Sequence, residues 1–329
     1  MIELYMQQPG QLMMREQAPE PAPGPGQVVI KVLYGGICGS DLRVYKGSVA
    51  YAQYPGRAGH EALGVVTAVG ADTSFAVGQK VVTFPNTFCG KCEFCRTGKT
   101  NLCQSKQSFG INAPGVFASE ITVDHRFLTP VPAGMPDKRA VLTEPFAVTV
   151  HALKKAQIQK SMSVAIVGCG TEGLLSTVFA NYMGADITII DVNPRKFPIA
   201  KKIGDVRTAG YAEIAGETFD VVVEAAGVKQ SIEQAVQLVK PGGALVMVGI
   251  TGEQVDFPVI YVVRNEITIY GSIIYTKADF DETLKLLADP NLPIEPIVSK
   301  IVPATEYQQA YADALTGNFA KIILDFQNL

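Results

Sequence analysis

A glycine-rich segment between a strand and a helix constrains the fold of this chain more than any other feature. The motif Gly-Cys-Gly-Thr-Glu-Gly at residues 168–173 directly follows the apolar run at 163–167. Its first glycine permits a tight turn, its second lets a phosphate approach the backbone, and its third allows close packing of helix on strand. The N-terminus of the following helix favours anions. We therefore expect a dinucleotide-binding βα unit with contacts from Gly168, Gly170, Thr171, Glu172 and Gly173.

An acidic residue follows the next predicted strand. Asp191 comes directly after the apolar run at 186–190. A carboxylate at this position accepts hydrogen bonds from ribose hydroxyls and repels a 2′-phosphate, so NAD(H) is favoured over NADP(H). Arg195 and Lys196 follow closely and keep NADP(H) as the alternative. Further cofactor contacts are expected from Lys196, Val248, Gly249 and Ser272.

The rhythm of strands divides the chain into two domains. Residues 163–271 alternate apolar strands with helices, which is typical of a parallel sheet covered on both faces. The preceding part has short strands separated by glycine and proline turns, which favours a β-rich barrel, and a strand at 321–326 could rejoin it. We expect an α/β protein with a catalytic domain at 1–148 and 286–329, and a Rossmann domain with a doubly wound parallel sheet at 149–285.

Four of the six cysteines form a tight cluster with the spacing Cys-x₂-Cys-x₂-Cys-x₇-Cys. Four thiolates so close together can enclose one tetrahedral Zn²⁺ without an open position. Disulfide bonds and an iron–sulfur cluster are the alternatives, but no export signal or electron-transfer motif supports them. A structural zinc site is predicted at Cys89, Cys92, Cys95 and Cys103.

A second group of metal-binding side chains lies upstream. Cys38, His60 and Glu61 offer a thiolate, an imidazole and a carboxylate, a set that suits an open, catalytic Zn²⁺. The segment Cys-Gly-Ser-Asp at 38–41, the Gly-His-Glu segment at 59–61, the four-cysteine lobe and the Rossmann unit occur in this order. In this combination the chain resembles the zinc-dependent medium-chain dehydrogenase family, particularly its polyol (sorbitol-like), galactitol-phosphate and threonine dehydrogenase branches.

The resemblance implies a GroES-like catalytic domain and two Zn²⁺ ions per chain. It implies Cys38, His60 and Glu61 as ligands of the catalytic ion. It also implies that Glu144, in the Glu-Pro-Phe-Ala-Val stretch at 144–148, is a fourth ligand or the partner of the zinc-bound water. Ser40 would take up the alcohol proton, and Asp41 would accept a hydrogen bond from the other His60 nitrogen.

The expected activity is reversible oxidation of a secondary alcohol to a ketone by hydride transfer to NAD⁺, as in NAD(P)-dependent alcohol dehydrogenases of class EC 1.1.1. A zinc ion makes a hydroxyl easier to deprotonate, and the nicotinamide accepts the hydride. The small-molecule substrate would be a polyol, sugar alcohol or cyclitol. Sorbitol itself is not expected, because Arg43 stands where many relatives have a relay histidine and Ile274 stands where the sorbitol branch has an arginine.

Two alternatives remain at this stage. Oxidation of a hydroxy-amino acid such as threonine requires an anion-binding group over the zinc, for which Arg57 is the candidate. A non-catalytic NAD-binding regulatory protein of the same fold would not need the ligand set Cys38, His60 and Glu61.

Composition restricts the partners. A net charge of −3 offers nothing to nucleic acid or to an anionic membrane. The N-terminal residues lack the pattern of a signal peptide, so a cytoplasmic protein is expected. The family resemblance implies a homodimer or homotetramer, with the strand at 267–271 as the contact.

Overall fold

The computed structural model describes all residues from 1 to 329 as two compact units. The β-rich unit comprises Met1–Glu144, Thr276–Ala288 and Val298–Leu329, and the parallel-sheet unit comprises Pro145–Tyr275 and Asp289–Ile297. The first boundary lies four residues before the predicted one. Helix α9 (Lys277–Leu287) belongs to the β-rich unit, so this division assigns to that unit a helix that the sequence analysis gave mostly to the Rossmann domain.

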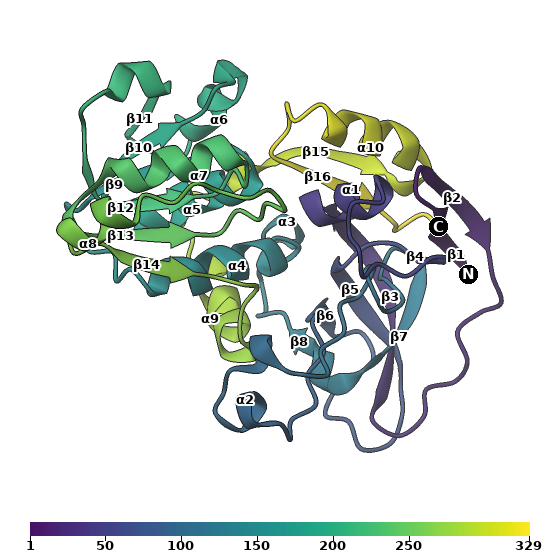
Figure 1. The fold of residues 1–329 in the computed structure, drawn as a ribbon. Coiled ribbons are helices and arrows are strands. Elements are labelled where there is room, and N and C mark those ends of the chain that lie inside the picture. Colours follow the sequence, from purple (N-terminus) through teal and green to yellow (C-terminus); the bar gives the residue numbers. More distant parts are fainter. The chain divides into compact units, whose positions relative to one another are not determined.

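The parallel-sheet unit contains six parallel strands in the order β11-β10-β9-β12-β13-β14 (Figure 1). In chain order these are β9 (Ser163–Val167), β10 (Asp186–Ile190), β11 (Val206–Ala209), β12 (Phe219–Glu224), β13 (Val239–Met247) and β14 (Thr268–Gly271). From the centre of the sheet, β9, β10 and β11 follow one another toward one edge, and β12, β13 and β14 follow one another toward the opposite edge. This is the order of a doubly wound dinucleotide-binding sheet, so the predicted fold class is confirmed.

The sheet interior is built from the apolar runs that the sequence analysis identified. In β9 and β12, residues 164–167 and 221–224 are all buried, because both faces of the central strands are covered. The helices of this unit are α4 (Thr143–Lys154, which starts in the other unit), α5 (Thr171–Tyr182), α6 (Phe197–Ala200), α7 (Lys229–Ala235) and α8 (Val259–Arg264). Pro194 and Pro198 limit the helical segment after β10 to a 3₁₀ turn followed by the short α6.

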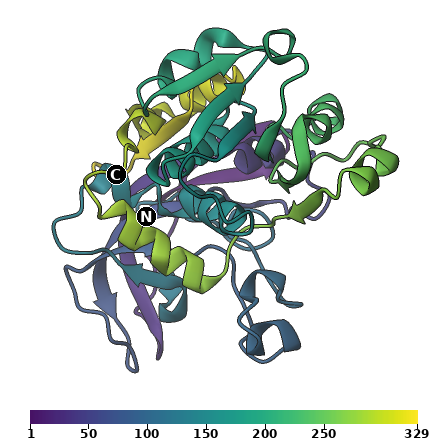
Figure 2. The ribbon, with the colours of Figure 1, turned by 90° about the vertical axis from the view of Figure 1, so that its left-hand side faces the viewer.

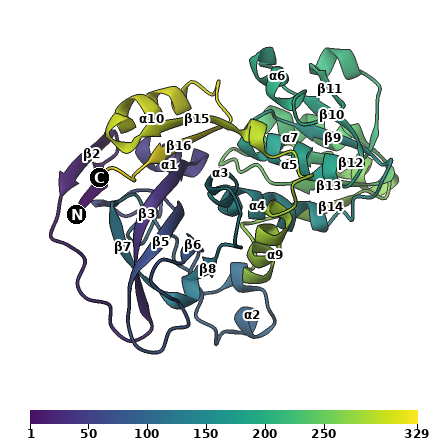
Figure 3. The same cartoon turned by 180° about the vertical axis from the view of Figure 1, so that it is seen from behind.

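The β-rich unit is organised around β3 (Gln27–Ile37), which pairs with three other strands in a seven-stranded sheet. The other strands of that sheet are β5 (Glu61–Val69), β6 (Lys80–Thr83), β7 (Glu120–Asp124), β8 (Leu128–Pro130), β15 (Val298–Pro303) and β16 (Lys321–Asp325). Figure 3 shows β16 beside β3, with which it pairs antiparallel. The predicted return of the C-terminal strand to the first domain is therefore confirmed.

A smaller sheet consists of β1 (Ile2–Gln8), β2 (Gln11–Glu16) and β4 (Gly56–Arg57). The hairpin of β1 and β2 was not predicted; its strands alternate poorly, and the prolines that follow at 19–25 dominated the sequence pattern. The helices of this unit are α1 (Gly39–Tyr45), α2 (Glu93–Arg96), α3 (Asp137–Ala140), α9 and α10 (Tyr307–Leu315). Figure 2 shows the cysteine-containing segment around α2 projecting from the strands.

No helix in the chain combines the length and the apolar character needed to cross a membrane.

The third glycine of the motif provides a test of the fold. A Cβ atom at Gly173 would lie 1.8 Å from the Gly168 carbonyl oxygen, whereas one at Gly170 would meet nothing within 4 Å. Because backbone cannot yield cheaply, we expect Gly173→Ala to lower the free energy of unfolding by about 1–3 kcal/mol or more. Gly170→Ala should lower it by less than about 1 kcal/mol. Urea denaturation followed by circular dichroism measures both, and equal effects would contradict this packing.

Candidate metal centre and dinucleotide site

Two strand ends bring the first group of metal-binding side chains together. Cys38 follows β3 and caps α1, while His60 directly precedes β5. In the antiparallel pairing of the two strands Gly36 lies opposite Glu61. The possible ligand atoms of Cys38, His60 and Glu61 consequently lie within 4.8 Å of one another. Residues 22 positions apart in sequence thus form one cluster, as the sequence analysis expected.

Asp41 connects the two ligands of this cluster that are not acidic. Its Oδ2 accepts a hydrogen bond of 2.8 Å from the Cys38 backbone N–H, and its Oδ1 lies 3.1 Å from His60 Nδ1. This arrangement was predicted, and it leaves His60 Nε2 for a metal ion. The Ser40 hydroxyl lies 3.4 Å from the same Nε2.

The electrostatic surroundings favour a charged imidazole when no metal is bound. Burial disfavours the charged form of His60, but the Asp41 carboxylate and Cys38 outweigh this cost and raise the pKa of His60 well above its ordinary value. A metal ion at Nε2 must therefore displace a proton, so metal affinity should fall at low pH.

Glu61 is already paired in this structure. Both of its oxygens accept from Lys321 Nζ, at 2.6 and 2.9 Å, and Lys321 also donates to the Ile37 carbonyl at 3.2 Å. The two side chains are 0% and 1% exposed. The predicted role of Glu61 as a direct zinc ligand would therefore compete with a buried ion pair, a partner that the sequence analysis missed because Lys321 lies 260 residues away.

Glu144 lies in the first turn of helix α4 and is buried. It is not among the three residues whose ligand atoms cluster within 4.8 Å. Its carboxylate stands at the end of the helix where the macrodipole favours negative charge. Its predicted role at the metal remains a prediction.

The four-cysteine lobe forms the second cluster. The sulfur atoms of Cys89, Cys92, Cys95 and Cys103 lie within 4.8 Å of one another. Backbone N–H groups of Gln104 and Cys95 lower the pKa of Cys92 to about 6, which favours the thiolate form that binds metal. Burial raises the pKa of Cys95 to about 12. All six cysteines are free thiols, so no disulfide competes with a metal. Four sulfur donors without an open position fit a closed tetrahedral Zn²⁺ site.

The glycine loop joins β9 to α5 as predicted. Gly168 has a φ of +103°, a conformation that favours glycine, and open space surrounds the position where a Cβ of Gly170 would stand. Glu172, unusual at this position, accepts a hydrogen bond from the Thr149 hydroxyl at 3.3 Å.

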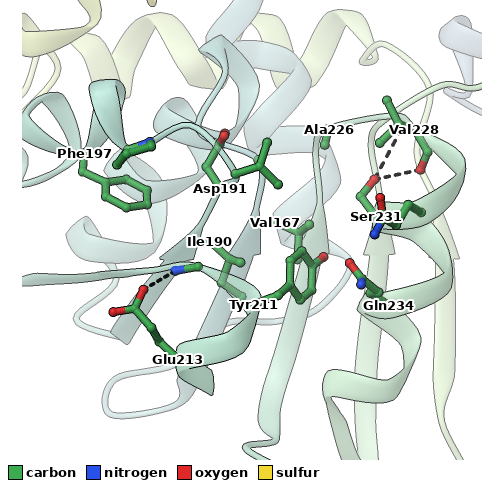
Figure 4. A pocket seen from close by; sticks show the side chains of 15 residues that line it. Val167, Ile190, Asp191, Phe197, Tyr211, Glu213, Ala226, Val228, Ser231 and Gln234 are labelled. Atoms are coloured by element: carbon green, nitrogen blue, oxygen red, sulfur yellow. Dashed lines mark hydrogen bonds between the residues drawn. The ribbon is translucent and has the colours of Figure 1, made fainter. Parts of the chain in front are cut away.

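Asp191 and the residues around it form the rim and wall of a cavity. Its two oxygens accept from the backbone N–H groups of Cys169 at 2.6 Å and Asn193 at 2.7 Å, which fixes the carboxylate beside the loop. The cavity measures about 400 Å³ and lies between the ends of β9, β10 and β12 (Figure 4). A crevice at the carboxyl ends of strands where the strand order reverses is where doubly wound sheets bind ligands.

The remaining predicted cofactor contacts lie on the same unit. Val248 and Gly249 both donate their backbone N–H groups to the Glu224 carbonyl, at 2.9 and 3.0 Å. The Ser272 hydroxyl is buried and has no hydrogen-bond partner. An orphaned polar atom of this kind, together with the open space at Gly170, fits a site that awaits a polar ligand.

Arg57, the candidate anion-binding group of the threonine alternative, is compensated by two acids. Its side chain lies 3.5 Å from Glu3, which also pairs with Arg15 at 2.7 Å, and 3.3 Å from Glu20. Two carboxylates thus balance two arginines in this group, so Arg57 has no surplus positive charge to attract a substrate carboxylate.

Comparison with known proteins agrees with both units. Residues 24–133 match the family model of the alcohol dehydrogenase GroES-like domain, and residues 173–289 match that of the zinc-binding dehydrogenase. The chain is 32% identical over 308 residues to a 2-dehydro-3-deoxy-L-galactonate 5-dehydrogenase of Pseudoalteromonas atlantica, covering 90% of each chain. It is 31% identical over 324 residues to a sorbitol dehydrogenase of Halalkalibacterium halodurans, covering 94% of each.

The fold is also similar to solved structures. A short chain alcohol dehydrogenase of Escherichia coli CFT073, complexed with NADH, superimposes with a TM-score of 0.92 at 25% identity and 98% coverage of both chains. Nearly the whole chain is therefore similar in fold to a protein that was solved in complex with NADH.

The buried ion pair beneath the first cluster yields a prediction. Lys321→Met removes the ammonium group that pairs with the buried Glu61 carboxylate. A buried charge left without its partner typically costs about 3–5 kcal/mol of stability. We therefore expect the variant to have a free energy of unfolding lower than that of the wild-type protein by this amount, when a chelator has removed metal from both proteins. The matched control, Lys31→Met, replaces a lysine whose amine is exposed, and should change it by about 0.5 kcal/mol or less.

The double variant Glu61→Gln/Lys321→Met decides the cause. Because it removes both charges, it should recover most of the loss. A double variant as unstable as Lys321→Met alone would show that lost packing, not the unpaired carboxylate, destabilises the protein.

Proposed function

Because this chain belongs to the zinc-binding, alcohol-dehydrogenase-like family, we propose that it oxidises a secondary alcohol to a ketone, reversibly, with NAD⁺ as the hydride acceptor. The observation that carries the proposal is the group formed by Cys38, His60 and Glu61 on one unit. The other unit has the strand order and glycine loop of a dinucleotide-binding sheet.

The donor atoms of this group fit a catalytic zinc ion. A sulfur and an imidazole nitrogen are ligands that Zn²⁺ favours, and a carboxylate from Glu61 or Glu144 would complete the protein share of an open site. When bound, Zn²⁺ supplies a Lewis acid that eases deprotonation of a hydroxyl, and NAD⁺ supplies the hydride acceptor.

The surrounding side chains orient the ligands and move the proton. Asp41 holds the His60 ring by its Nδ1 and holds Cys38 by its backbone, so both ligands share one support. Ser40 has its hydroxyl beside His60 Nε2 and would take up the substrate proton. Lys321 donates to both oxygens of Glu61, so this carboxylate would share its negative charge between the buried ammonium group and a metal ion.

The residues of the parallel-sheet unit fit NAD⁺. Gly170 leaves room for the pyrophosphate and Asp191 presents a fixed carboxylate for ribose hydroxyls. The Ser272 hydroxyl, which has no partner, is available as a donor. Contacts by Thr171, Lys196, Val248 and Gly249 are part of this proposal, and the carboxylate of Asp191 disfavours NADP⁺.

We propose a polyol, sugar alcohol, cyclitol or related sugar acid as the substrate. The named activities of the two relatives both concern hydroxyl-rich carbon chains. The compensated charge of Arg57 argues against a hydroxy-amino acid. Free thiols throughout the chain suit a reducing compartment, so we also propose a cytoplasmic location.

An assay of turnover and metal content tests this function. Purified protein with NAD⁺ and a panel of polyols, cyclitols and sugar acids should produce reduced cofactor, read by absorbance. Elemental analysis should find two zinc ions per chain, one for each cluster. His60→Ala should retain only the cysteine-lobe zinc and lose turnover, because it removes an imidazole ligand.

The matched control is His125→Ala, which changes a histidine outside both clusters and should keep both metals and turnover. If wild-type protein with two zinc ions and bound NAD⁺ oxidised no secondary alcohol, the regulatory alternative would be favoured. Intact turnover in His60→Ala would refute the proposed role of the first cluster.

We also propose that the chain forms a homo-oligomer through the edge of its parallel sheet. Strand β14 pairs only with β13, so its other edge can pair with a second copy. Helix α8, just before it, exposes Val259, Ile260 and Val263 by 63–71%.

Ile260→Glu should shift the particle mass from a multiple of 35.2 kDa toward that of a monomer, because a charge would be buried at the contact. Analytical ultracentrifugation measures this. Val77→Glu, at an equally exposed valine of the β-rich unit, is the control. A monomeric wild-type protein would refute the contact.

A further inference from the structure

The cavity beside Asp191 has the size and the walls of a binding site for a flat ring. Its volume is about 400 Å³, and it is lined by apolar side chains of the strand ends, including Val167 and Ile190. Asp191, the expected contact of the ribose hydroxyls, is one of the residues that line the cavity. On the proposed function, therefore, the base of the dinucleotide enters this cavity.

Tyr211 carries an unsatisfied polar atom at this cavity. It follows β11, its ring lines the cavity, and its hydroxyl is buried without a hydrogen-bond partner. Burial, with the nearby Glu224 and Asp191 carboxylates, raises the pKa of Tyr211, so the hydroxyl remains protonated. A protonated phenol in this setting is a hydrogen-bond donor that lacks an acceptor.

Gln234 is the candidate acceptor on the wall of this cavity, whereas Glu224, whose buried Oε2 also lacks a partner, is not among the residues that line it. Gln234 lies on helix α7 and lines the same cavity. Figure 4 shows the Tyr211 hydroxyl and the Gln234 amide pointing toward one another, without a hydrogen bond between them. A small rotation of the flexible glutamine side chain would let the hydroxyl donate to Oε1. That bond would satisfy the phenol and would also fix which end of the amide carries the oxygen.

An amide fixed in this way distinguishes purine bases. Adenine presents an amino donor beside a ring-nitrogen acceptor, which a glutamine amide can pair with through both of its ends. Hypoxanthine presents a carbonyl acceptor in place of the amino group, so Oε1 would face another acceptor. A freely rotating amide could turn over and pair with the carbonyl and the N1–H group of hypoxanthine. An amide whose Oε1 accepts from the Tyr211 hydroxyl can turn over only by taking the acceptor away from that buried phenol proton, which is costly.

We propose that Gln234 reads the adenine of the dinucleotide and that Tyr211 sets the orientation of its amide. This inference rests on the proposed function and adds a specificity-determining pair to it. Neither residue belongs to the glycine motif or to the metal clusters, and neither takes part in hydride transfer.

Equilibrium binding, independent of turnover, tests the proposal. Isothermal titration calorimetry would compare NAD⁺ with nicotinamide hypoxanthine dinucleotide, which differs only in the base. Wild-type protein should bind NAD⁺ about five- to a hundredfold more tightly. Gln234→Leu should lose this preference mainly by weaker binding of NAD⁺. Tyr211→Phe should reduce the preference mainly by tighter binding of the hypoxanthine dinucleotide, because the amide is released.

Two matched controls lie outside the cavity. Tyr182→Phe changes an exposed tyrosine that donates to Asp289, and Gln237→Leu changes an exposed glutamine next to α7. Both should keep the wild-type preference. Equal wild-type affinity for the two dinucleotides, or an unchanged preference in Gln234→Leu and Tyr211→Phe, would overturn the base-reading pair while leaving NAD⁺ binding intact. Binding of neither dinucleotide would overturn the proposed function as well.

Discussion

The antiparallel pairing of β3 with β5 is the constraint on which the metal centre depends. It places the end of one strand against the start of the other, so that Cys38, His60 and Glu61 converge without any of them lying on a long loop. Rigid strand ends hold ligands more precisely than flexible segments do. Strand β16 pairs with the other edge of β3, and this brings Lys321 into contact with Glu61. The central strand β3 therefore positions Cys38, the residues at the start of β5 and the lysine that neutralises Glu61.

Close approach of backbone is the second recurring requirement. At Gly36 a side chain would collide with the Glu61 carboxylate, and at Gly173 it would collide with the carbonyl of Gly168. In the β-rich unit the space beside the glycine is filled by the buried ion pair, and in the parallel-sheet unit by the carbonyl group of Gly168, against which helix α5 packs. Each unit thus uses glycine where functional groups must come nearer to the backbone than a Cβ atom allows.

Much of this arrangement could be read from local patterns. The parallel strands were predicted because their apolar runs are short, continuous and separated by helical segments. The cysteine cluster was predicted from its spacing, and the group of Cys38, His60 and Glu61 from its residue types and from the family resemblance. Lys321 could not be found in this way, since only the tertiary pairing of β16 with β3 brings it to Glu61. Tyr211 and Gln234 belong to no recognisable sequence motif, and their proposed role could be inferred only from the cavity that both residues line. The assignment of α9 to the β-rich unit likewise follows from packing, because its own sequence is an ordinary amphipathic helix.

The sequence separation between Lys321 and its acidic partner has a consequence for folding. Glu61 and Lys321 are 260 residues apart, and only the pairing of β16 with β3 brings them together. Until that pairing forms, the Glu61 carboxylate lacks the counter-ion that it has in the folded unit. Contacts between distant segments form later than local ones, because a long loop must be closed first. The charge balance around the metal-binding side chains is therefore completed only when the non-local part of the β-rich sheet has assembled.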